Sequence, residues 1–368
     1  MRAAVVIEQC WHRVPGGTAR AAIEQTRAVA ATGRVEQIGV AARHASAPPE
    51  PFRPPIPVRH LGLPRRLLYE TWHRLRWPAV ERATGPVDVI HATGYAVPPR
   101  TRPLVVTMHD LAWRHDPANF TRNGVLFFEA GLRRAVASAD LVLCPSRATL
   151  EDCAAAGVDR SRLRCVPWGM TCETVSQNEV GKVRSRYGLD GRYVLFVGTL
   201  EPRKNLPRLL EAFARLPQRD VRLAVAGPPG WGDALGPRAA ALGDRVRLLG
   251  FVGPGDLGPL YAGASVLCYP SLVEGYGLPV AEALGHGTPV VTSSGTATEE
   301  LVAGGVGLAV DPRDVDAIAE ALARVLDDPD LAEHMRQAGG ARAAETTWEA
   351  TATMTVAAYE EAAAGVPG

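Results

Sequence analysis

Lysine is nearly absent from this sequence: of its 40 basic residues only Lys182 and Lys204 are lysines, and the rest are arginine. The basic residues face 39 acidic ones, so the net charge of +1 gives no reason to expect bulk affinity for nucleic acid. No apolar run is long enough to span a bilayer. A lysine that persists among so many arginines is a candidate for a specific role, and this directs attention to Lys204.

The cysteines also lack any pattern of their own. They lie singly, without the paired spacing of a metal site or a disulfide framework, at positions 10, 144, 153, 165, 172 and 268. Several fall in apolar runs, which favours buried free thiols in a reducing compartment. The N-terminal stretch turns polar after a short apolar run and does not fit a signal peptide. We therefore expect a cytoplasmic protein.

The 368 residues suit two domains rather than one. Short apolar runs alternate with helical patterns in two series, at 3–7, 87–92, 104–110, 141–146 and 163–169, and again at 193–199, 221–227, 246–252, 265–271, 288–293 and 307–310. Near-continuous apolar runs separated by helices indicate parallel strands with both faces covered. The sequence therefore predicts two Rossmann-like, doubly wound α/β domains, with ligands bound in the cleft between them.

The polar, aperiodic stretch at 167–190 marks the boundary between these domains. We expect an N-terminal domain over 1–172 and a C-terminal domain over 173–345. The last segment, 346–368, reads as a helix without a following strand that could return to the first domain. The proline-rich stretch at 45–58 is predicted to be a loop of the first domain.

The stretch "EGYGLPVAE" at 274–282 combines carboxylates with a glycine-rich turn. Gly275 and Gly277 permit positive φ and close approach of a ligand, and Pro279 suits the start of a helix. A helix N-terminus attracts anions, whereas Glu274 and Glu282 would repel them. A ligand with an anionic part for the N–H groups and hydroxyls for the glutamates resolves this conflict, and a nucleotide sugar is such a ligand.

The cation pair Arg203–Lys204 lies in "GTLEPRKN" (198–205), directly after the first strand of the second series. Arginine offers a bidentate fork and lysine a compact charge, so the two would neutralise a diphosphate. The alternative is a solvated pair before a helix. Position alone does not decide between the two.

The first domain offers two weaker signals. "PGGTAR" (15–20) opens a helix after the first strand, and Gly16 and Gly17 would bring N–H groups near a phosphate or sugar; a plain loop-to-helix turn is the alternative. His109 ends the run at 104–110, where it could bond sugar hydroxyls or transfer a proton, with Asp110 to orient it. A structural histidine is the alternative here.

Read together, these segments resemble the family 4 glycosyltransferases, also called glycosyl transferases group 1, which are retaining enzymes of the two-domain GT-B fold. The residues that carry the resemblance are "GTLEPRKN", "YPSLVEGYGLPVAEALGHGTPVVTS" (269–293), the "HD" at 109–110, "PGGTAR" and the closing "WE" at 348–349. The resemblance implies a nucleotide diphosphate sugar held mainly by the C-terminal domain and an acceptor held mainly by the N-terminal one.

The resemblance also implies roles for individual donor-site residues. Arg203 and Lys204 would hold the diphosphate, and the backbone of Gly277 and Leu278 would meet its phosphate. Thr199 stands where many members carry arginine, so Arg203 is expected to bear more of the charge.

The remaining roles concern the sugar, the ribose and the base. Glu274 would touch the hydroxyls of the donor sugar, and His109 would approach the same sugar. Glu282 would hold the ribose. The backbone near Phe251 and Val252 would meet the base.

The reaction expected from this resemblance is hexosyl transfer with retention, with mannose from GDP-mannose as the candidate. The acceptor would be a hydroxyl of a glycan, a glycolipid or a small molecule. No DxD-type aspartate pair in a loop indicates a metal for the leaving diphosphate, so we expect neither metal nor cofactor, with protein cations in that role. No second carboxylate is placed as a covalent nucleophile, which disfavours the double displacement of hydrolases.

Two alternatives stay open at this point: a sugar-nucleotide epimerase of the same architecture, and a catalytically silent nucleotide-sugar-binding subunit that regulates a partner. Lys204, Glu274 and Glu282 argue against a silent protein. A nicotinamide enzyme is disfavoured, because no G-x-G-x-x-G follows the first strand.

The segment at 63–82 predicts a basic amphipathic helix, with arginines around an apolar stripe of Leu68, Trp72, Leu75 and Ala79. Such a helix can lie on the inner face of an anionic membrane, which would suit a lipid-linked acceptor. A helix that packs its stripe on its own sheet is at least as well supported.

Overall fold

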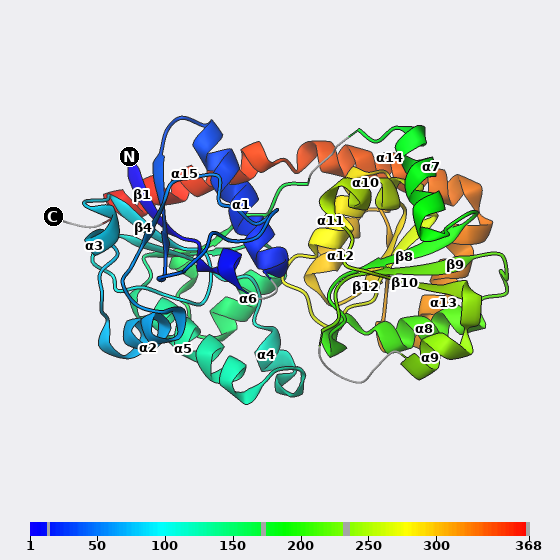
Figure 1. The fold of residues 1–368 in the computed structure, drawn as a ribbon, viewed down its shortest axis with the longest axis horizontal. Helices are drawn as coiled ribbons and strands as arrows, with labels where there is room; N and C mark the ends of the chain where they lie inside the picture. Colours follow the sequence, from blue (N-terminus) through cyan, green and yellow to red (C-terminus); the bar gives the residue numbers. More distant parts are fainter. Residues whose placement is uncertain (13–14, 171–173, 231–235, 366–368) are drawn as a thin grey trace. The chain divides into compact units, whose positions relative to one another are not determined.

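The protein has two compact units, seen here in a computed structural model that describes residues 1–12, 15–170, 174–230 and 236–365. The first unit comprises Met1–Gly169 with Trp348–Gly368, and the second comprises Met170–Thr347. Each is a parallel sheet between layers of helices (Figure 1). The expected α/β class with two doubly wound, Rossmann-like domains is therefore confirmed.

The first unit contains a seven-stranded parallel sheet in the order β3-β2-β1-β4-β5-β6-β7. Its strands are β1 (Arg2–Val6), β2 (Glu36–Ala41), β3 (Val58–His60), β4 (Val89–Ala92), β5 (Leu104–Thr107), β6 (Leu141–Cys144) and β7 (Leu163–Cys165). Strands β4, β5 and β6 are buried along their whole length, which explains their unbroken apolar runs. Two strands were not predicted from the sequence: β2, where glutamate and glutamine interrupt the apolar pattern, and β3, which is short and follows prolines.

Helices cover both faces of this sheet. They are α1 (Gly16–Ala31), α2 (Arg65–Leu75), α3 (Glu81–Thr84), α4 (Ala112–His115), α5 (Arg122–Ser138), α6 (Arg147–Ala155) and α15 (Trp348–Ala364), with short 3-10 turns at η1 (Glu8–Trp11), η2 (Pro117–Asn119) and η3 (Arg160–Arg162). Helix α15 packs beside α1, where the Gln25 amide donates to the Thr355 hydroxyl at 2.9 Å. The last helix of the chain is thus part of the core of the first unit.

The second unit contains a six-stranded parallel sheet in the order β10-β9-β8-β11-β12-β13. Its strands are β8 (Tyr193–Val197), β9 (Arg222–Ala226), β10 (Val246–Gly250), β11 (Val266–Tyr269), β12 (Val290–Ser293) and β13 (Leu308–Val310). All six coincide with apolar runs of the second series. The four inner strands β8, β9, β11 and β12 are almost wholly buried, whereas the edge strands β10 and β13 are only partly covered.

The helices of the second unit are α7 (Gln177–Tyr187), α8 (Leu206–Arg215), α9 (Gly236–Ala241), α10 (Pro254–Gly263), α11 (Leu278–Gly285), α12 (Ala297–Val302), α13 (Val315–Asp327) and α14 (Pro329–Glu345), with 3-10 turns at η4 (Pro202–Lys204) and η5 (Gly243–Arg245). Local signals set several of their ends. A capping box of Ser176 and Glu179 starts α7, and Gly188 in the left-handed region ends it.

Both sheets reverse their strand order at a topological switch point, between β1 and β4 in the first unit and between β8 and β11 in the second. In open α/β sheets, ligands bind beyond the carboxyl ends of the strands at this place. The loops that follow β8 and β11 contain the two motifs singled out above, "EPRKN" and "EGYGLPVAE".

The helix predicted over 63–82 is shorter than expected. Helix α2 ends at Leu75, Arg76 adopts φ 54°, and Pro78 precedes the separate α3. Proline cannot continue a helix and disfavours helical backbone at the residue before it, so the pattern breaks here. The predicted stripe splits accordingly: Leu68 and Trp72 are buried in the core, whereas Leu75 is 70% exposed.

Candidate active site

The cation pair of the second unit meets Glu274 at the switch point. Lys204 comes from η4 after β8, and Glu274 comes from the loop after the neighbouring strand β11. The Lys204 ammonium donates to Glu274 Oε1 at 2.5 Å, and Arg203 Nη1 lies 3.3 Å from the same oxygen. Two motifs 70 residues apart therefore form one cluster, because adjacent parallel strands end at the same edge of the sheet.

This cluster is shielded from solvent, which makes its charges interact strongly. The Lys204 and Glu274 side chains are each 8% exposed. Burial alone would raise the pKa of the Glu274 carboxyl, but the adjacent Lys204 and Arg203 cations lower it to about 2. Burial and the like charge of Arg203 lower the pKa of the Lys204 ammonium, while Glu274 and Glu201 oppose that shift. Glu274 is therefore an ionised carboxylate held between two cations.

Two further residues complete the cluster, and sequence reasoning missed both. Glu201 accepts from Arg203 Nη2 at 2.7 Å and is itself buried. The Tyr269 hydroxyl accepts a hydrogen bond from Lys204, and the Lys204 ammonium lies 4.9 Å from the Tyr269 ring centroid. Both lie inside motifs already noted, Glu201 in 198–205 and Tyr269 at the start of 269–293, so their position next to a strand end was the available signal. The four charged groups, two cations and two carboxylates, balance one another.

Glycine is required at Gly277, where the loop turns into α11. Its φ is 97°, and a Cβ built there would overlap the Thr298 methyl group. Any side chain would therefore clash as well as strain the backbone. Helix α11 begins directly afterwards at Leu278, with Pro279, which has no N–H, as its second residue. The Val280 and Ala281 N–H groups donate to the Gly277 carbonyl at 2.9 and 3.1 Å, so of the first turn only the Leu278 N–H is left for an anion. The glycine turn before the helix is confirmed, and anion binding there stays a prediction.

Glu282 lies in the second turn of α11 and has its own partner, separate from the cation cluster. Its carboxylate accepts a hydrogen bond from the Tyr261 hydroxyl of α10 at 2.8 Å, and it is 7% exposed. Tyr261 in turn stacks on His286, with ring centroids 5.8 Å apart. Glu282 is thus positioned by a neighbouring helix, which is more than the helix-dipole role that any acidic residue near a helix start could play.

Phe251 and Val252, expected to meet the base through their backbone, follow the edge strand β10. The Phe251 ring is 64% exposed, whereas Val252 is buried. Gly250 just before them has a φ of 66°, which turns the chain away from the sheet. An exposed aromatic ring in this place offers a surface on which a base can stack.

In the first unit, His109 stands just beyond the end of β5 and is 5% exposed. Its Nε2–H donates to the Thr93 carbonyl at 2.8 Å, and its ring lies 5.4 Å from that of Trp168. Nδ1 is a buried atom without a hydrogen-bond partner among the described residues. Burial lowers the pKa of His109, against the effects of the Thr93 carbonyl and Asp110. The neutral imidazole therefore presents Nδ1 as an acceptor, suited to a hydroxyl group.

The remaining predicted residues of the first unit lie as follows. Asp110 accepts from the Ala112 N–H at 3.0 Å and so holds the turn into α4; the orienting partner of His109 is the Thr93 carbonyl instead. Gly16 starts α1 with a φ of 63°, and both Gly16 and Gly17 are exposed.

Several groups that could suggest metal or redox chemistry have structural roles. Asp314 and Asp316 have the D-x-D spacing, but Asp314 caps the start of α13 and Asp316 pairs with Arg215. The described cysteines are thiols rather than disulfides, four of them buried, and Cys172 lies outside the described residues. Within the described ranges, no three His, Cys, Asp or Glu side chains are grouped as a metal site would need.

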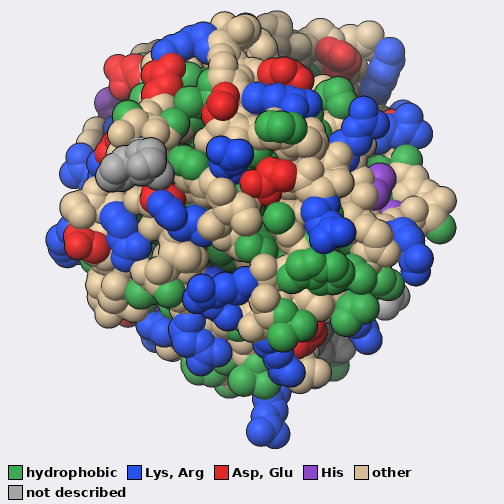
Figure 2. All heavy atoms as spheres, turned by 90° about the vertical axis from the view of Figure 1, so that its left-hand side faces the viewer, with side chains coloured by type: hydrophobic (Ala, Val, Ile, Leu, Met, Phe, Trp, Pro, Cys, Tyr) green, Lys and Arg blue, Asp and Glu red, His purple; other side chains and the backbone are tan. Residues whose placement is uncertain are grey.

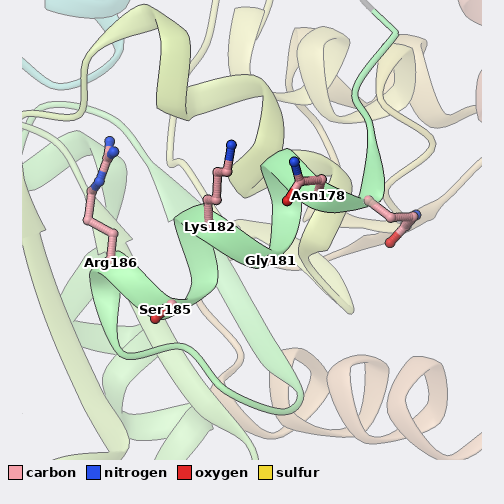
Figure 3. A pocket seen from close by; sticks show the side chains of 6 residues that line it. Asn178, Gly181, Lys182, Ser185 and Arg186 are labelled. Atoms are coloured by element: carbon pink, nitrogen blue, oxygen red, sulfur yellow. The ribbon is translucent and has the colours of Figure 1, made fainter.

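The other lysine of the chain provides a contrast with Lys204. Lys182 is exposed on α7, where it lines a shallow hollow together with Gln177, Asn178, Gly181, Ser185 and Arg186 (Figure 3). In Figure 3 the Lys182 and Arg186 side chains extend from the same side of the helix. The two lysines thus differ completely in burial and in partners.

Solved structures confirm the fold. HepE from Anabaena, solved with UDP and glucose, has a TM-score of 0.77 at 20% sequence identity over 98% of this chain and 99% of its own. Likeness at this level of identity establishes the architecture alone. Two doubly wound parallel sheets, one of them with a buried cation–carboxylate cluster at its switch point, give this chain the GT-B architecture.

Sequence comparison identifies the family within that class. The family model described as Glycosyl transferases group 1 matches residues 182–342, and the one described as Glycosyltransferase Family 4 matches residues 15–174. The chain belongs to this family of glycosyltransferases. The resemblance seen in the sequence motifs is therefore confirmed, and so is the expectation of a transferase.

Two curated relatives are named as mannosyltransferases. O-antigen chain mannosyltransferase B of Escherichia coli is 34% identical over 287 residues, which cover 74% of each chain. The MMP alpha-(1->4)-mannosyltransferase of Mycolicibacterium hassiacum is 33% identical over 278 residues, covering 73% of this chain and 64% of the relative. These are transferases, so the epimerase and the silent regulatory subunit receive no support from them.

Proposed function

We propose that this glycosyltransferase moves a hexose, with mannose as the candidate, from a nucleotide diphosphate sugar to a hydroxyl of a glycan or lipid-linked acceptor. It would do so with retention of configuration and without a metal. The observation that carries this proposal is the buried cluster of Arg203, Lys204 and Glu274. The names of the two mannosyltransferase relatives support mannose.

The charge balance of the cluster suggests how it would respond to a donor. Without ligand, the two cations are paired with Glu274 and Glu201. A diphosphate would draw Arg203 and Lys204 towards its oxygens and release Glu274 to accept from the sugar hydroxyls. Preorganised cations facing the charge that develops on a leaving group are a large source of catalysis. Lys204 and Arg203 would thus serve the leaving diphosphate, where other enzymes use a metal ion.

Retention would follow from attack on the face that the diphosphate leaves. The acceptor oxygen bonds to the anomeric carbon as the bond from that carbon to the phosphate oxygen breaks, and the departing phosphate oxygen takes the acceptor proton. Glu274 would accept from donor-sugar hydroxyls, and His109 would accept from one through its Nδ1. Glu282 would hold the ribose, and Phe251 and Val252 would meet the base. The backbone of Gly275, Gly277 and Leu278 would contact phosphate. From the first unit, Gly16 and Gly17 would contact phosphate or sugar through their backbone.

A thermal-shift screen of nucleoside diphosphates tests the proposal and names the base. GDP, UDP or dTDP should raise the melting temperature, since a ligand that binds only the folded state stabilises it, and NAD should not. We expect GDP to give the largest shift if the donor is GDP-mannose. A chain that responds to none of the three diphosphates would contradict the proposed donor.

Stereochemistry and metal dependence are tested on the active enzyme. NMR of the new glycosidic bond should show the anomeric configuration of the donor, and an inverted product would overturn retention. Chelation with EDTA should leave the rate nearly unchanged. Loss of activity that Mg²⁺ or Mn²⁺ restores would overturn the metal-free role of Arg203 and Lys204.

Contact with a membrane would suit a lipid-linked acceptor, and the surface of α2 supports it. Leu67, Leu75 and Trp77 are exposed, and Arg82 lies over the Trp77 ring at 5.6 Å. Figure 2 shows basic and hydrophobic side chains together over the lower half of this face of the molecule, at the height where Figure 1 draws α2. Exposed apolar side chains among arginines are typical of proteins that lie on anionic lipid.

Vesicle sedimentation tests this contact. The protein should bind vesicles that contain phosphatidylglycerol, and replacing Leu75 and Trp77 with alanine should weaken binding. Equal binding of the variant, or no binding of the unchanged protein, would exclude α2 as a membrane surface. For the described ranges, no helix is both long and apolar enough to cross a bilayer.

A further inference from the structure

A second cavity lies in the first unit, at the carboxyl ends of β2 and β3. It is open to solvent, has a volume of about 530 Å³ and is lined by Trp11, His44, Arg53 and His60, together with residues 45–48, 54 and 58. Its lining combines aromatic rings, an arginine and proline-rich backbone. The segment at 45–58 was predicted only as a loop, so none of these residues was expected to form a site.

Three rings form the aromatic part of the cavity. Trp11 and His44 stack in parallel, with centroids 4.9 Å apart and planes 9° apart. His60 stands edge-on to both, at 5.6 Å from Trp11 and 6.1 Å from His44. Two of the rings are fixed by a hydrogen bond from a ring nitrogen to a backbone carbonyl: Trp11 Nε1 to Ser46 at 2.9 Å, and His60 Nδ1 to Ala42 at 2.6 Å.

His44 is held by a buried carboxylate beneath the cavity. Glu8 is 1% exposed and accepts from the Ala42 N–H at 2.7 Å and from His44 Nε2 at 2.8 Å. These bonds use one ring nitrogen of each histidine and leave His44 Nδ1 and His60 Nε2 to face a ligand. No described residue hydrogen-bonds either of them.

The segment at 45–58, which lines the rest of the cavity, is also held in place. Residues 45–58 contain six prolines, which restrict the backbone before any ligand arrives. Phe52 and Val58 of this segment pack, together with Trp11, on a small core that includes Ile7 and Cys10. Arg53 pairs with Glu50 at 3.0 Å, and both side chains are largely exposed.

We infer that this cavity is a saccharide subsite that binds a sugar ring of the acceptor at a distance from the reacting hydroxyl. The apolar face of a pyranose matches an aromatic platform, and its hydroxyls, which both donate and accept, match the two imidazole nitrogens and the Arg53 donors. This inference rests on the proposed function, which places the reacting sugar beside His109.

The position of the cavity in the sheet determines which acceptors would use it. His109 follows β5, whereas His44 follows β2 and His60 ends β3. In the strand order β3-β2-β1-β4-β5 these places are three and four strands apart, or roughly 14–19 Å at about 4.8 Å per strand. One sugar ring cannot reach both. The cavity therefore selects oligosaccharide acceptors over short ones.

Acceptor length is the variable that tests this subsite. We would compare mannose with linear manno-oligosaccharides in titration calorimetry and in transfer assays, using the unchanged protein and a variant with Arg53→Ala and His60→Ala. Arg59→Ala is the matched control, because Arg59 is an exposed arginine of strand β3 that does not line the cavity. Trp11→Phe, which keeps a ring, and Trp11→Ala form a second pair, of which only the alanine variant should weaken binding of the longer saccharides.

The double variant should bind the longer saccharides about tenfold more weakly and raise their KM about tenfold, the effect of about 1.4 kcal/mol. Affinity for GDP, kcat and the KM for mannose should stay unchanged, and Arg59→Ala should match the unchanged protein. Equal affinity of the double variant for long saccharides, or no binding of them by the unchanged protein, would overturn the subsite. If no nucleoside diphosphate binds, the proposed function fails. Calorimetry with the saccharides still shows, independently of that result, whether the cavity binds a sugar ring.

Discussion

The carboxyl ends of the two sheets share one topology but carry opposite chemistry. In the second unit, the loops after β8 and β11 bring together two cations and two carboxylates that are paired and buried. In the first unit, the corresponding edge carries rings: His109 beside Trp168, and Trp11 beside His44 and His60. One edge handles ionic charge, and the other offers aromatic faces and imidazole nitrogens.

This difference teaches that topology and chemistry are set separately. The strand order places a loop cluster at the switch point of each sheet, whatever its residues. The loop residues then decide the ligand. Buried cations suit a diphosphate, whereas neutral imidazoles and aromatic rings suit sugar hydroxyls and sugar faces. The two edges are consistent with a donor bound mainly by the second unit and an acceptor bound mainly by the first.

The largest expected effect tests the ionic edge. Lys204→Ala should lower kcat by ~100-fold or more, because a buried cation beside the leaving diphosphate is lost. Lys182→Ala is the matched control: it removes the only other lysine, which lies exposed on α7, and should transfer sugar at the normal rate. Thermal unfolding would confirm that both variants are folded. Normal turnover in Lys204→Ala would refute the role assigned to this cluster.

Glu274 should act on turnover rather than on nucleotide affinity. Glu274→Gln should lower kcat by about tenfold or more, since contacts with the sugar that strengthen in the transition state govern turnover. Affinity for GDP should hold or increase, because the carboxylate that neutralises Lys204 and Arg203 is gone. Glu201→Gln, which removes only the partner of Arg203, should reduce kcat less. A loss of GDP affinity equal to the loss in kcat would contradict this division.

Glu282 should act on binding rather than on turnover. Glu282→Gln should weaken binding of donor and GDP by roughly 1–3 kcal/mol, the range for a lost hydrogen bond to a charged group, and change kcat little. Tyr261→Phe keeps the carboxylate and removes only its partner at 2.8 Å, so its effect should be smaller. If the two variants lose stability equally and keep their GDP affinity in calorimetry, Glu282 has only a packing role.

The smallest effect concerns the neutral imidazoles of the first unit. His91 is buried between the Tyr359 and Thr107 hydroxyls, and burial, with a lesser effect of His109, lowers its pKa to about 3 from 6.5. The unfolded chain therefore binds a proton that the folded one does not, and the free energy of unfolding should fall as pH decreases from 6.5 towards 3.

Urea unfolding across this pH range measures that slope. His91→Gln should flatten it by up to about 1.4 kcal/mol per pH unit, the value for one proton. His334→Gln provides the control, because His334 is an exposed histidine of the second unit. The slope, rather than the absolute stability, is the informative quantity, since His91→Gln also alters two buried hydrogen bonds. If the slope of unfolding free energy against pH is the same in His91→Gln as in the unchanged protein, the pKa of His91 does not differ between the folded and unfolded chain.

The sequence pointed to the residues that meet in the second unit better than to those that meet in the first, for a physical reason. Gly277 and Pro279 have local meaning, since a positive φ and a helix start are properties of a few neighbouring residues. Strands that are buried on both faces can also be predicted, because they appear in the sequence as apolar runs. The helix at 63–82 was predicted too long because its periodicity continued past Pro78, although a proline there cannot extend it.

The cavity at the carboxyl ends of β2 and β3 had no comparable local signal in the sequence. Trp11, His44 and His60 are spread over fifty positions: Trp11 follows β1, whereas His44 follows β2 and His60 ends β3, and neither β2 nor β3 was predicted from the sequence. Their meeting depends on β2 and β3 joining the sheet beside β1, and on Glu8 fixing the imidazole of His44. Glu201 and Tyr269 were missed likewise, because their significance lies in their contacts with Arg203 and Lys204 rather than in their spacing.

The sequence by itself determined the two-domain α/β class, the glycine turn before α11 and the family, because hydrophobic burial, backbone conformation and local motifs depend on short stretches of chain. Only the tertiary structure decided which charges pair, that burial lowers the pKa of His109 and leaves its Nδ1 available, that α15 joins the first unit, and that three rings line one open cavity. Pairing, burial and the pKa values that follow depend on residues far apart in the chain, which adjacent parallel strands bring to one edge of a sheet.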